Sequence, residues 1–515
     1  MNETIAVVDF GSQYRQLITR RVRENHVHSR LFAPSVTPDE LRRAGVAGII
    51  LSGGPASTYE TGAPTCDPGL LALDVPVLGV CYGMQLACRL LGAKVRSAAC
   101  REYGRTPLRI RTSDPLLEHV PAETTVWMSH GDVVDALPDD FKSLADTPDC
   151  PLAVVRHGAR PFWGVQFHPE VTHTPHGGQI LRNFLYGLCG CRGTWRPDNM
   201  VEQAVADIRD VVPDEARVLC GLSGGVDSSV TAALLQRAVG DRLTCIFVDN
   251  GLLRTDERDR VEATFRGHFH MDLRVIDAAE QFLSRLAGVT DPQEKRRRIG
   301  HTFIDVFRAA ATDVSNARFL AQGTLYPDVI ESGRSAAGTA AGIKLHHNVG
   351  GLPDDLGFEL IEPLRDMFKD EVRQVGELLG LPEELIWRHP FPGPGLAVRV
   401  VGEVTAARLD LLRRADDIIV SEIAAAGWDR KVGQAFGVLL PVSSVGVMGD
   451  GRTYAGMHVI AVRVVETTDY MTADWVPLDA ALLGRIAGRI VNEVPGVNRV
   501  VYDITSKPPG TIEWE

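Results

Sequence analysis

Two short segments of this chain carry residue types that do chemistry, and the two differ in kind. Residues 79–83 (GVCYG) place a thiol between glycines, and residues 223–229 (SGGVDSS) combine glycines with hydroxyls and one carboxylate. The first pattern is typical of a cysteine nucleophile on a sharp turn, and the second of a loop that binds phosphate groups. A chain with both can break one molecule with a thiol and activate another with a nucleoside triphosphate.

The elements that position Cys81 are a predicted strand over 75–80 and a predicted helix over 83–91. The glycines at 79 and 83 permit the strained backbone and close packing that such a strand-to-helix turn requires. The N-terminus of the helix behind the sulfur favours the thiolate. A buried structural cysteine is the alternative interpretation.

A base for this thiol follows the predicted strand over 161–167, in the order His168-Pro169-Glu170. In extended backbone, residues two apart point the same way, so Glu170 can orient His168. His168 would take the thiol proton and later protonate leaving ammonia, while Glu170 fixes the tautomer. A histidine that is only a satisfied polar group is the alternative.

Glycines also follow the predicted strand over 47–51, where residues 51–55 (LSGGP) can aim backbone N–H groups at an oxyanion. A simple turn is the alternative. With these features, residues 4 to 190 resemble the class I glutamine amidotransferases. The resemblance implies an oxyanion hole from the amides of Gly54 and Tyr82, a glutamine contact by Gln85, and a further substrate-side loop at 129–132.

The second loop lies between a predicted strand over 217–222 and a predicted helix over 226–239, so amides and a helix N-terminus converge on one anion site. It lacks the Gly-Lys-Ser/Thr of a Walker A loop and suits pyrophosphate better. Asp227 can hold Mg²⁺. A purely structural turn is the alternative. The candidate phosphate-binding residues are Ser223, Gly224, Gly225, Val226, Asp227, Ser228 and Ser229.

This loop resembles that of the PP-loop ATP pyrophosphatases, which adenylate a carbonyl oxygen and release pyrophosphate. The resemblance implies that the end of the next strand, at Val248, lies against the adenosine, and that residues 323–328 form another wall of the same crevice. Binding at the carboxyl ends of parallel strands is where open α/β sheets place ligands.

The remainder of the chain resembles the GMP synthetase family at residues 343–348, 362–364, 368–373, 389–396 and 506–515, with departures at Leu345 and Gly510. The resemblance implies xanthosine monophosphate (XMP) as the acceptor and a homodimer through the C-terminal domain. It implies XMP contacts from Arg296, Gln434, Lys507 and Glu513, and a lid with Lys344, His346 and His347.

Simpler interpretations stay open for these segments. The alternative interpretation of residues 295–298 (KRRR) is a solvated charge run. For His346 and His347 it is a metal pair, for which no third ligand is apparent, and for the tail at 506–515 it is a frayed end. Cys189-x-Cys191 is a possible metal fragment. A related ligase with another carbonyl acceptor and a silent nucleotide-binding protein are the rival functions.

Length and composition bound these hypotheses. The 515 residues suggest three or four domains. We predict three, at 1–193, 194–388 and 389–515: a flavodoxin-like open parallel sheet, a second open parallel α/β sheet with the PP-loop, and a small α+β domain. The net charge of −12 argues against nucleic-acid binding, and no apolar run reaches membrane-span length.

The nine cysteines show no pairing pattern, and the N-terminus lacks the basic leader of a signal peptide. We therefore expect a cytoplasmic protein. Glutamine, ATP and XMP are its expected ligands, Mg²⁺ enters with ATP, and no tightly bound organic cofactor is expected.

Overall fold

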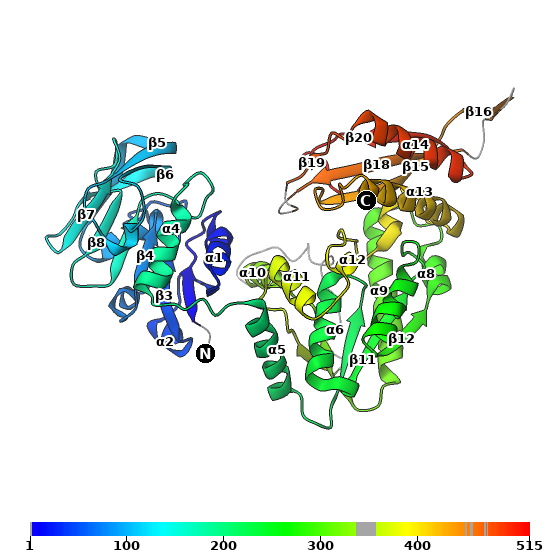
Figure 1. The fold of residues 1–515 in the computed structure, drawn as a ribbon, viewed down its shortest axis with the longest axis horizontal. Coiled ribbons are helices and arrows are strands. Elements are labelled where there is room, and N and C mark those ends of the chain that lie inside the picture. Colours follow the sequence, from blue (N-terminus) through cyan, green and yellow to red (C-terminus); the bar gives the residue numbers. More distant parts are fainter. Residues whose placement is uncertain (1–2, 336–356, 449–450, 454–456, 468–469, 471) are drawn as a thin grey trace. The chain divides into compact units, whose positions relative to one another are not determined.

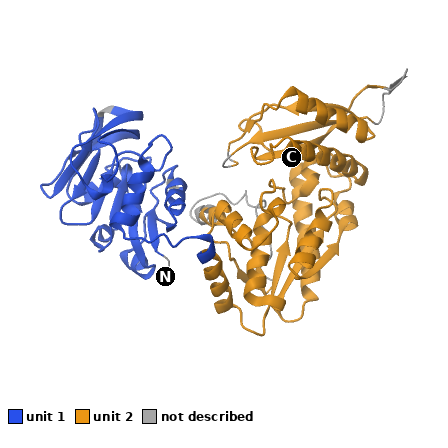
Figure 2. Ribbon diagram, in the orientation of Figure 1, with its two compact units in different colours: residues 1–199 blue, residues 200–515 orange. Residues whose placement is uncertain are grey.

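A computed structural model describes residues 3–335, 357–448, 451–453, 457–467, 470 and 472–515. The chain forms two compact units, residues 1–199 and 200–515, which are coloured separately in Figure 2. In the part of the chain that is described, no helix is long and apolar enough to cross a membrane.

The N-terminal unit is built on one nine-stranded sheet with the order β2-β1-β3-β4-β9-β8-β7-β5-β6 (Figure 1). Its first five strands are parallel, and the other four are antiparallel. The parallel strands are β1 (Thr4–Val8), β2 (His28–Phe32), β3 (Val46–Leu51), β4 (Val77–Val80) and β9 (Phe162–Val165); the antiparallel ones are β5 (Lys94–Ile110), β6 (Glu123–Ala136), β7 (Phe141–Asp146) and β8 (Val154–His157).

Alternation along the parallel strands gives this sheet two apolar faces. Val7 and Ile50 face one hydrophobic core with α1 (Arg15–Glu24) and α4 (Gly177–Arg182), and Ala6 and Ile49 face another with α2 (Pro38–Arg43) and α3 (Tyr82–Leu90). The predicted α/β class with a parallel sheet is confirmed, and the antiparallel strands were not predicted.

The second unit contains a fully parallel sheet with the order β12-β11-β10-β13-β14. The chain starts at β10, runs outward through β11 and β12, and then returns to the other side of β10 with β13. The order therefore reverses between β10 and β13, which is where open α/β sheets bind ligands. The strands are β10 (Arg217–Leu222), β11 (Leu243–Asp249), β12 (Asp272–Asp277), β13 (Ala317–Ala321) and β14 (Glu359–Ile361).

Helices flank this parallel sheet. The predicted strand over 217–222 and the predicted helix over 226–239 are both confirmed residue for residue. The helices are α5 (Pro197–Val211), α6 (Val226–Val239), α7 (Glu257–Glu262), α8 (Ala279–Leu286), α9 (Pro292–Thr312), α10 (Tyr326–Ser335), α11 (Lys369–Leu378) and α12 (Glu383–Ile386).

The C-terminal part of the second unit is a small mixed sheet with two helices, α13 (Ala406–Ala425) and α14 (Ala480–Glu493). The antiparallel pair β15 and β18 forms its centre, β19 and β20 flank β18, and β16 and β17 form a separate hairpin. The strands are β15 (Gln434–Ser443), β16 (Gly446–Met448), β17 (Gly451–Thr453), β18 (His458–Glu466), β19 (Asp474–Trp475) and β20 (Val497–Asp503).

One hydrophobic core connects the two sheets of the second unit. Leu219 and Ile246 of the parallel sheet belong to the same buried cluster as Leu439 and Ile460 of the C-terminal sheet. Shared burial of this kind resists separation of the two parts, so residues 200–515 form one compact unit. The three domain boundaries stay a prediction.

Candidate active sites

Cys81 occupies a strained turn between β4 and α3. Its φ of 51° and ψ of −110° are uncommon for a residue with a side chain. A Cβ at Gly79 would lie 2.6 Å from the Cα of Met84, and one at Gly83 would lie 2.3 Å from the carbonyl oxygen of Leu51. Neither contact is possible, so this turn requires glycine at both positions.

His168 and Glu170 lie in the segment after β9, which ends at Val165, and His168 lies beside this thiol. The Nδ1 of His168 is 2.7 Å from Oε1 of Glu170, and both side chains are buried. Backbone anchors hold the segment, since Thr174 Oγ1 donates to the His168 carbonyl (2.7 Å) and Arg21 Nε donates to the Glu170 carbonyl (2.9 Å).

The environment of His168 stabilises its protonated form. Burial lowers the pKa of the imidazole, but the Glu170 carboxylate and the Cys81 sulfur outweigh burial and hold that pKa well above its ordinary value. The geometry therefore suits a thiol that passes its proton to His168, with Glu170 stabilising the resulting imidazolium.

The glycine loop after β3 faces the same two side chains. A Cβ at Gly53 would lie 3.1 Å from Cε1 of His168 and 3.8 Å from Cβ of Cys81, and one at Gly54 would lie 2.9 Å from the Phe10 carbonyl oxygen. At Gly53 the backbone therefore approaches His168 as closely as it does because no side chain intervenes, whereas Gly54 packs against Phe10 and Tyr82.

Gln85 lies on the first turns of α3 and is buried. Its Nε2 donates to the Asp132 carbonyl (2.8 Å) and to Oε1 of Gln166 (3.1 Å), and Nε2 of Gln166 lies 3.7 Å from the Cys81 sulfur. Gln166 was not predicted as a site residue; the available signal was its place two residues before His168 within the strand predicted over 161–167, although β9 itself ends at Val165.

The predicted phosphate-binding loop, residues 223–229, follows β10 and runs into the first turn of α6, at the point where the strand order reverses. Oγ of Ser228 accepts from the Ser223 amide (3.2 Å), and Oγ of Ser223 accepts from the Gly225 amide (3.3 Å). Ser229 is buried, and its hydroxyl donates to the Gly225 carbonyl (2.7 Å). The hydroxyls therefore shape the loop, and Gly224, with a φ of +74°, provides its left-handed turn.

Asp227 stands in the first turn of α6. Its Oδ2 lies 3.6 Å from the Lys369 ammonium, whereas its Oδ1 is buried and has no hydrogen-bond partner among the described residues. Burial raises the pKa of this carboxyl, Asp328 adds to the rise, and Lys369 opposes it. A buried carboxylate oxygen that lacks a donor fits a divalent cation, because Mg²⁺ prefers oxygen ligands.

Arg388 and Glu257 lie near the loop and were not predicted. Nη1 of Arg388 donates to the Gly224 carbonyl (3.1 Å) and pairs with Oε1 of the buried Glu257 (2.7 Å).

Val248, near the end of β11, is 4% exposed and so offers little side-chain surface to a ligand.

The predicted XMP residues lie in the second unit, and two of them, Gln434 and Glu513, meet. Nε2 of Gln434 donates to the Pro390 carbonyl (2.8 Å) and lies 3.5 Å from Oε1 of Glu513. Arg296 donates to the Glu515 carbonyl oxygen, in the same C-terminal tail. Lys507 donates to the Tyr470 carbonyl (2.7 Å). The tail is therefore docked and not frayed.

The buried charges that hold this tail were not predicted. Arg399 is wholly buried and donates to both carboxylate oxygens of Glu513 (3.0 and 2.8 Å), and the wholly buried Lys295 pairs with Glu515. The predicted lid residues Lys344, His346 and His347 lie outside the described residues.

Family models match three parts of the chain. A model described as class-I glutamine amidotransferase matches residues 6–188. One described as a tRNA methyl transferase HUP domain matches residues 216–309, and one described as a GMP synthase C-terminal domain matches residues 421–514.

Curated relatives match over the whole length. A glutamine-hydrolyzing GMP synthase of Caldanaerobacter subterraneus is 54% identical and covers 100% of this chain and 99% of the relative. Proteins of the same description from Thermobifida fusca and Thermomicrobium roseum are 55% and 56% identical, with 98% and 97% of each relative covered.

Proposed function

The chain belongs to the family of glutamine-hydrolyzing GMP synthases, and on this premise we propose how its residues divide the reaction. A synthase of this family hydrolyses glutamine to ammonia, activates XMP with ATP and aminates it to GMP. The observation that carries the assignment of roles is that one chain holds a thiol, imidazole and carboxylate on a strained turn, and a phosphate-binding loop where a parallel sheet reverses its order.

In the glutaminase half, Cys81 attacks the side-chain amide of glutamine. His168 accepts the thiol proton and delivers it to the departing ammonia, while Glu170 holds the ring. Water then cleaves the thioester to glutamate and restores the thiol. The amides of Gly54 and Tyr82 stabilise the oxyanion in each step, and Gln85 helps to hold the glutamine.

In the synthetase half, the amides of the 223–229 loop hold the ATP phosphates, and the backbone near Val248 borders the adenosine. Asp227 would hold Mg²⁺, which neutralises phosphate charge when it is bound. The XMP oxygen attacks the α-phosphorus, pyrophosphate leaves, and ammonia then displaces AMP to give GMP. This role for Asp227 is supported by its Oδ1 atom, which is buried and has no hydrogen-bond partner among the described residues.

The acceptor would be held by Arg296, Gln434, Lys507 and Glu513. Support for a common site comes from the short separation of Gln434 and Glu513 and from the tie between Arg296 and the tail that carries Glu513. We propose Lys344, His346 and His347 as lid residues on the family resemblance alone.

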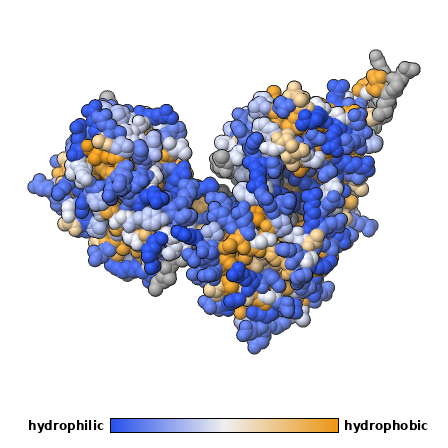
Figure 3. Space-filling view, in the orientation of Figure 1, coloured by the Kyte–Doolittle hydropathy of each residue, from blue (hydrophilic) through white to orange (hydrophobic). Residues whose placement is uncertain are grey.

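We also propose a homodimer through the C-terminal part and a cytoplasmic location. Exposed apolar side chains at Val445, Val447 and Ile504 support a partner surface there, and Figure 3 shows apolar residues at the base of the β16 hairpin. The eight described cysteines are all free thiols, which is consistent with a reducing compartment.

The test supplies ATP, Mg²⁺, glutamine and XMP and measures all nucleotide products. We expect GMP, AMP and pyrophosphate in equal amounts, since adenylation releases one of each per turnover. Formation of ADP would contradict adenylation, and replacing XMP by inosine monophosphate gives the control without the C2 oxygen.

A further inference from the structure

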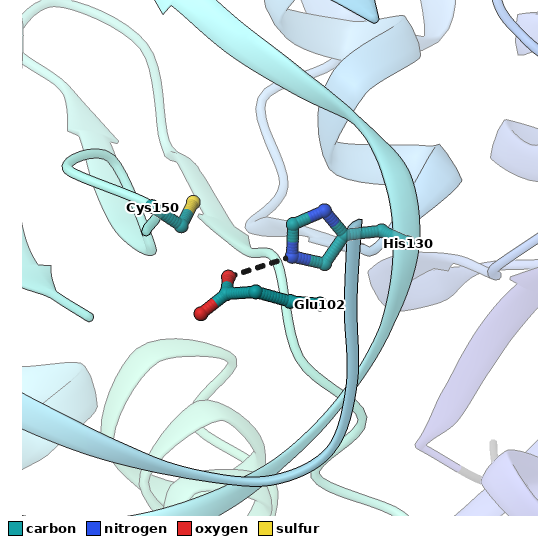
Figure 4. A group of neighbouring side chains, drawn as sticks. All are labelled: Glu102, His130 and Cys150. Atoms are coloured by element: carbon teal, nitrogen blue, oxygen red, sulfur yellow. Dashed lines mark hydrogen bonds and ion pairs between the residues drawn. The ribbon is translucent and has the colours of Figure 1, made fainter. Parts of the chain in front are cut away.

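A buried polar cluster lies in the N-terminal unit, and one of its members, His130, belongs to the segment 129–132 that the family resemblance implies on the substrate side. Glu102 on β5, His130 on β6 and Cys150 in the turn after β7 are shown in Figure 4, and Thr147 lies in the same turn. Oε2 of Glu102 is 3.1 Å from Nε2 of His130, and Oε1 of Glu102 accepts from Thr147 Oγ1 (2.9 Å). Both oxygens of this buried carboxyl are thus engaged.

Proton placement in the cluster follows from the partners of His130. Its Nδ1 lies 3.0 Å from the Asp132 carbonyl oxygen, which only accepts, so Nδ1 carries a hydrogen. Its Nε2 faces a carboxyl oxygen of Glu102, and a single proton between these two atoms makes the second hydrogen bond of the ring. The ring is therefore held at both nitrogens and cannot rotate without losing a buried hydrogen bond.

This ring sits within the backbone segment 129–132, which also contacts the glutaminase site. The Ser129 carbonyl oxygen lies 3.7 Å from the Cys81 sulfur and accepts its hydrogen bond. The Asp132 carbonyl, already bonded to His130, accepts the 2.8 Å bond from Gln85 as well. Two carbonyl groups on either side of His130 thus face the thiol and the residue assigned to glutamine.

We propose that Glu102 and His130 are positioning residues of the glutaminase: they fix segment 129–132 so that its carbonyl groups orient Gln85 and the Cys81 thiol. The proposal rests on the proposed role of Cys81. In this positioning role, His130 touches neither glutamine nor the Cys81 sulfur. A displacement of about 1 Å at such a segment is enough to cost about 100-fold in rate.

Two substitutions at His130 separate its two bonds. In His130→Asn, the amide nitrogen lies near the place of Nδ1 and keeps the bond to Asp132, whereas His130→Gln reaches Glu102 but not the Asp132 carbonyl. We expect His130→Gln to raise the KM for glutamine by about tenfold or more, because a lost buried hydrogen bond costs about 1–3 kcal/mol. His130→Asn keeps the bond to Asp132 but loses the bond to Glu102, so it should raise the KM by a smaller factor, about threefold, on the same scale.

The conservative variant is Glu102→Gln, whose amide donates to Nε2 of His130 and whose carbonyl accepts from Thr147. It should keep the parent KM, whereas Glu102→Ala should raise it. Thermal unfolding of each variant reports stability separately. A cluster with only a structural role would lower the unfolding temperature of both His130 variants and leave the KM of the folded protein unchanged, which would overturn the proposal.

Three further results are decisive. Synthesis of GMP from ammonium should be at the parent level in every variant, and its loss would contradict the assignment to the glutaminase. The zinc content of the purified parent and of Glu102→Gln is also measured. One zinc ion per chain in the parent and none in Glu102→Gln would overturn the proposal, because the cluster would then be a metal site. If Cys81→Ala retains glutamine-dependent synthesis, the proposed function itself fails. If Cys81→Ala loses that synthesis but His130→Gln keeps the parent KM for glutamine, only the positioning role fails.

Discussion

The thiol site and the nucleotide site differ in how completely the protein builds them without substrates. Cys81, His168 and Glu170 are 5%, 4% and 1% exposed, and their polar contacts are formed within one unit. At the nucleotide site, Ser223 is exposed and Asp227 keeps a buried oxygen that no described residue satisfies. At the thiol site, Oε2 of Glu170 is also buried without a hydrogen-bond partner among the described residues, but the His168 ring is already paired with Oε1 of Glu170. The protein itself therefore supplies the paired imidazole of the first site, whereas the loop of the proposed nucleotide site is open to charges that ligands would supply.

This difference follows from the chemistry of the two sites. A cysteine nucleophile depends on a perturbed proton equilibrium, which only fixed partners in a buried site can maintain. Phosphoryl and adenylyl transfer depends on positioning and on neutralising charge, and much of that charge arrives with the nucleotide and its cation. Substitutions should therefore damage the thiol site through small displacements and the nucleotide site through lost charge.

The largest effect is expected at Asp227. Asp227→Asn removes the carboxylate that we assign to Mg²⁺, so GMP formation should fall by about 1,000-fold or more with either nitrogen donor, on the scale of lost electrostatic stabilisation. Initial rates with glutamine and with ammonium measure it. Asp210→Asn, at an exposed position of α5, is the matched control. Retained synthesis from ammonium would place the cation elsewhere.

A pair of adjacent glycines tests how rigid the thiol site is. A Cβ at Gly177 would lie 2.0 Å from the carbonyl oxygen of Pro169, between His168 and Glu170, while a Cβ at Gly178 has nothing within 4 Å. Gly177→Ala should lower the free energy of unfolding by about 1–3 kcal/mol through overpacking.

The same variant should lower glutaminase kcat/KM by about 100-fold through displacement of His168. Gly178→Ala should leave both quantities within error of the parent, and calorimetry with a glutaminase assay compares the two. Equal behaviour of the two variants would show that the site tolerates displacement.

The raised pKa of His168 predicts a pH dependence with a definite sign. Protonation of His168 stabilises the native state below the unfolded pKa of about 6.5, and this contribution is lost as pH rises through the raised native pKa. Glu170→Gln removes the carboxylate that raises it. The stability difference from the parent should be largest below the unfolded pKa and should shrink at alkaline pH.

The pH profile of glutaminase kcat/KM gives the second reading of the same variant. Its alkaline limb should move to lower pH in Glu170→Gln, because His168 then loses its proton earlier. If the alkaline limb of the kcat/KM profile in Glu170→Gln stays at the same pH as in the parent, Glu170 does not control the His168 proton.

The smallest effect is expected at Arg388. In Arg388 one nitrogen, Nη1, makes both the bond to the Gly224 carbonyl and the ion pair with Glu257, and a lysine, whose ammonium sits on a flexible stem and not in a planar guanidinium, does not fix its nitrogen at that place. Arg388→Lys should raise the KM for ATP by about fivefold, on the scale of one lost hydrogen bond of about 1 kcal/mol. Steady-state kinetics measure it, with Arg365→Lys, in an exposed pair, as the control. An unchanged KM would make the Arg388 contact irrelevant to ATP.

The predictable parts of the molecule were those that local patterns determine. The strand at 217–222 and the helix at 226–239 combine apolar runs with a glycine loop, and they were predicted with their observed bounds. The turn at Cys81 was predictable because glycines two residues away on each side imply close backbone packing, which the contacts at Gly79 and Gly83 confirm.

Features that depend on distant partners were not predictable. Strand β5 mixes charged residues with Gly104 and Pro107 and has no clear apolar alternation, so its pairing with β6 left no local signal. Arg399 and Lys295 would be assigned to the surface by residue type. They are buried because Glu513 and Glu515, more than 100 residues away in sequence, neutralise them.

The central claim, that the thiol site only supplies ammonia while the loop at Ser223 activates the acceptor, is tested most directly by Cys81→Ala assayed with two nitrogen donors. The account predicts that GMP synthesis from glutamine falls by about 1,000-fold or more, as for loss of a nucleophile, while synthesis from ammonium stays at the parent rate. Loss of the ammonium reaction in a folded variant, or survival of the glutamine reaction, would contradict it.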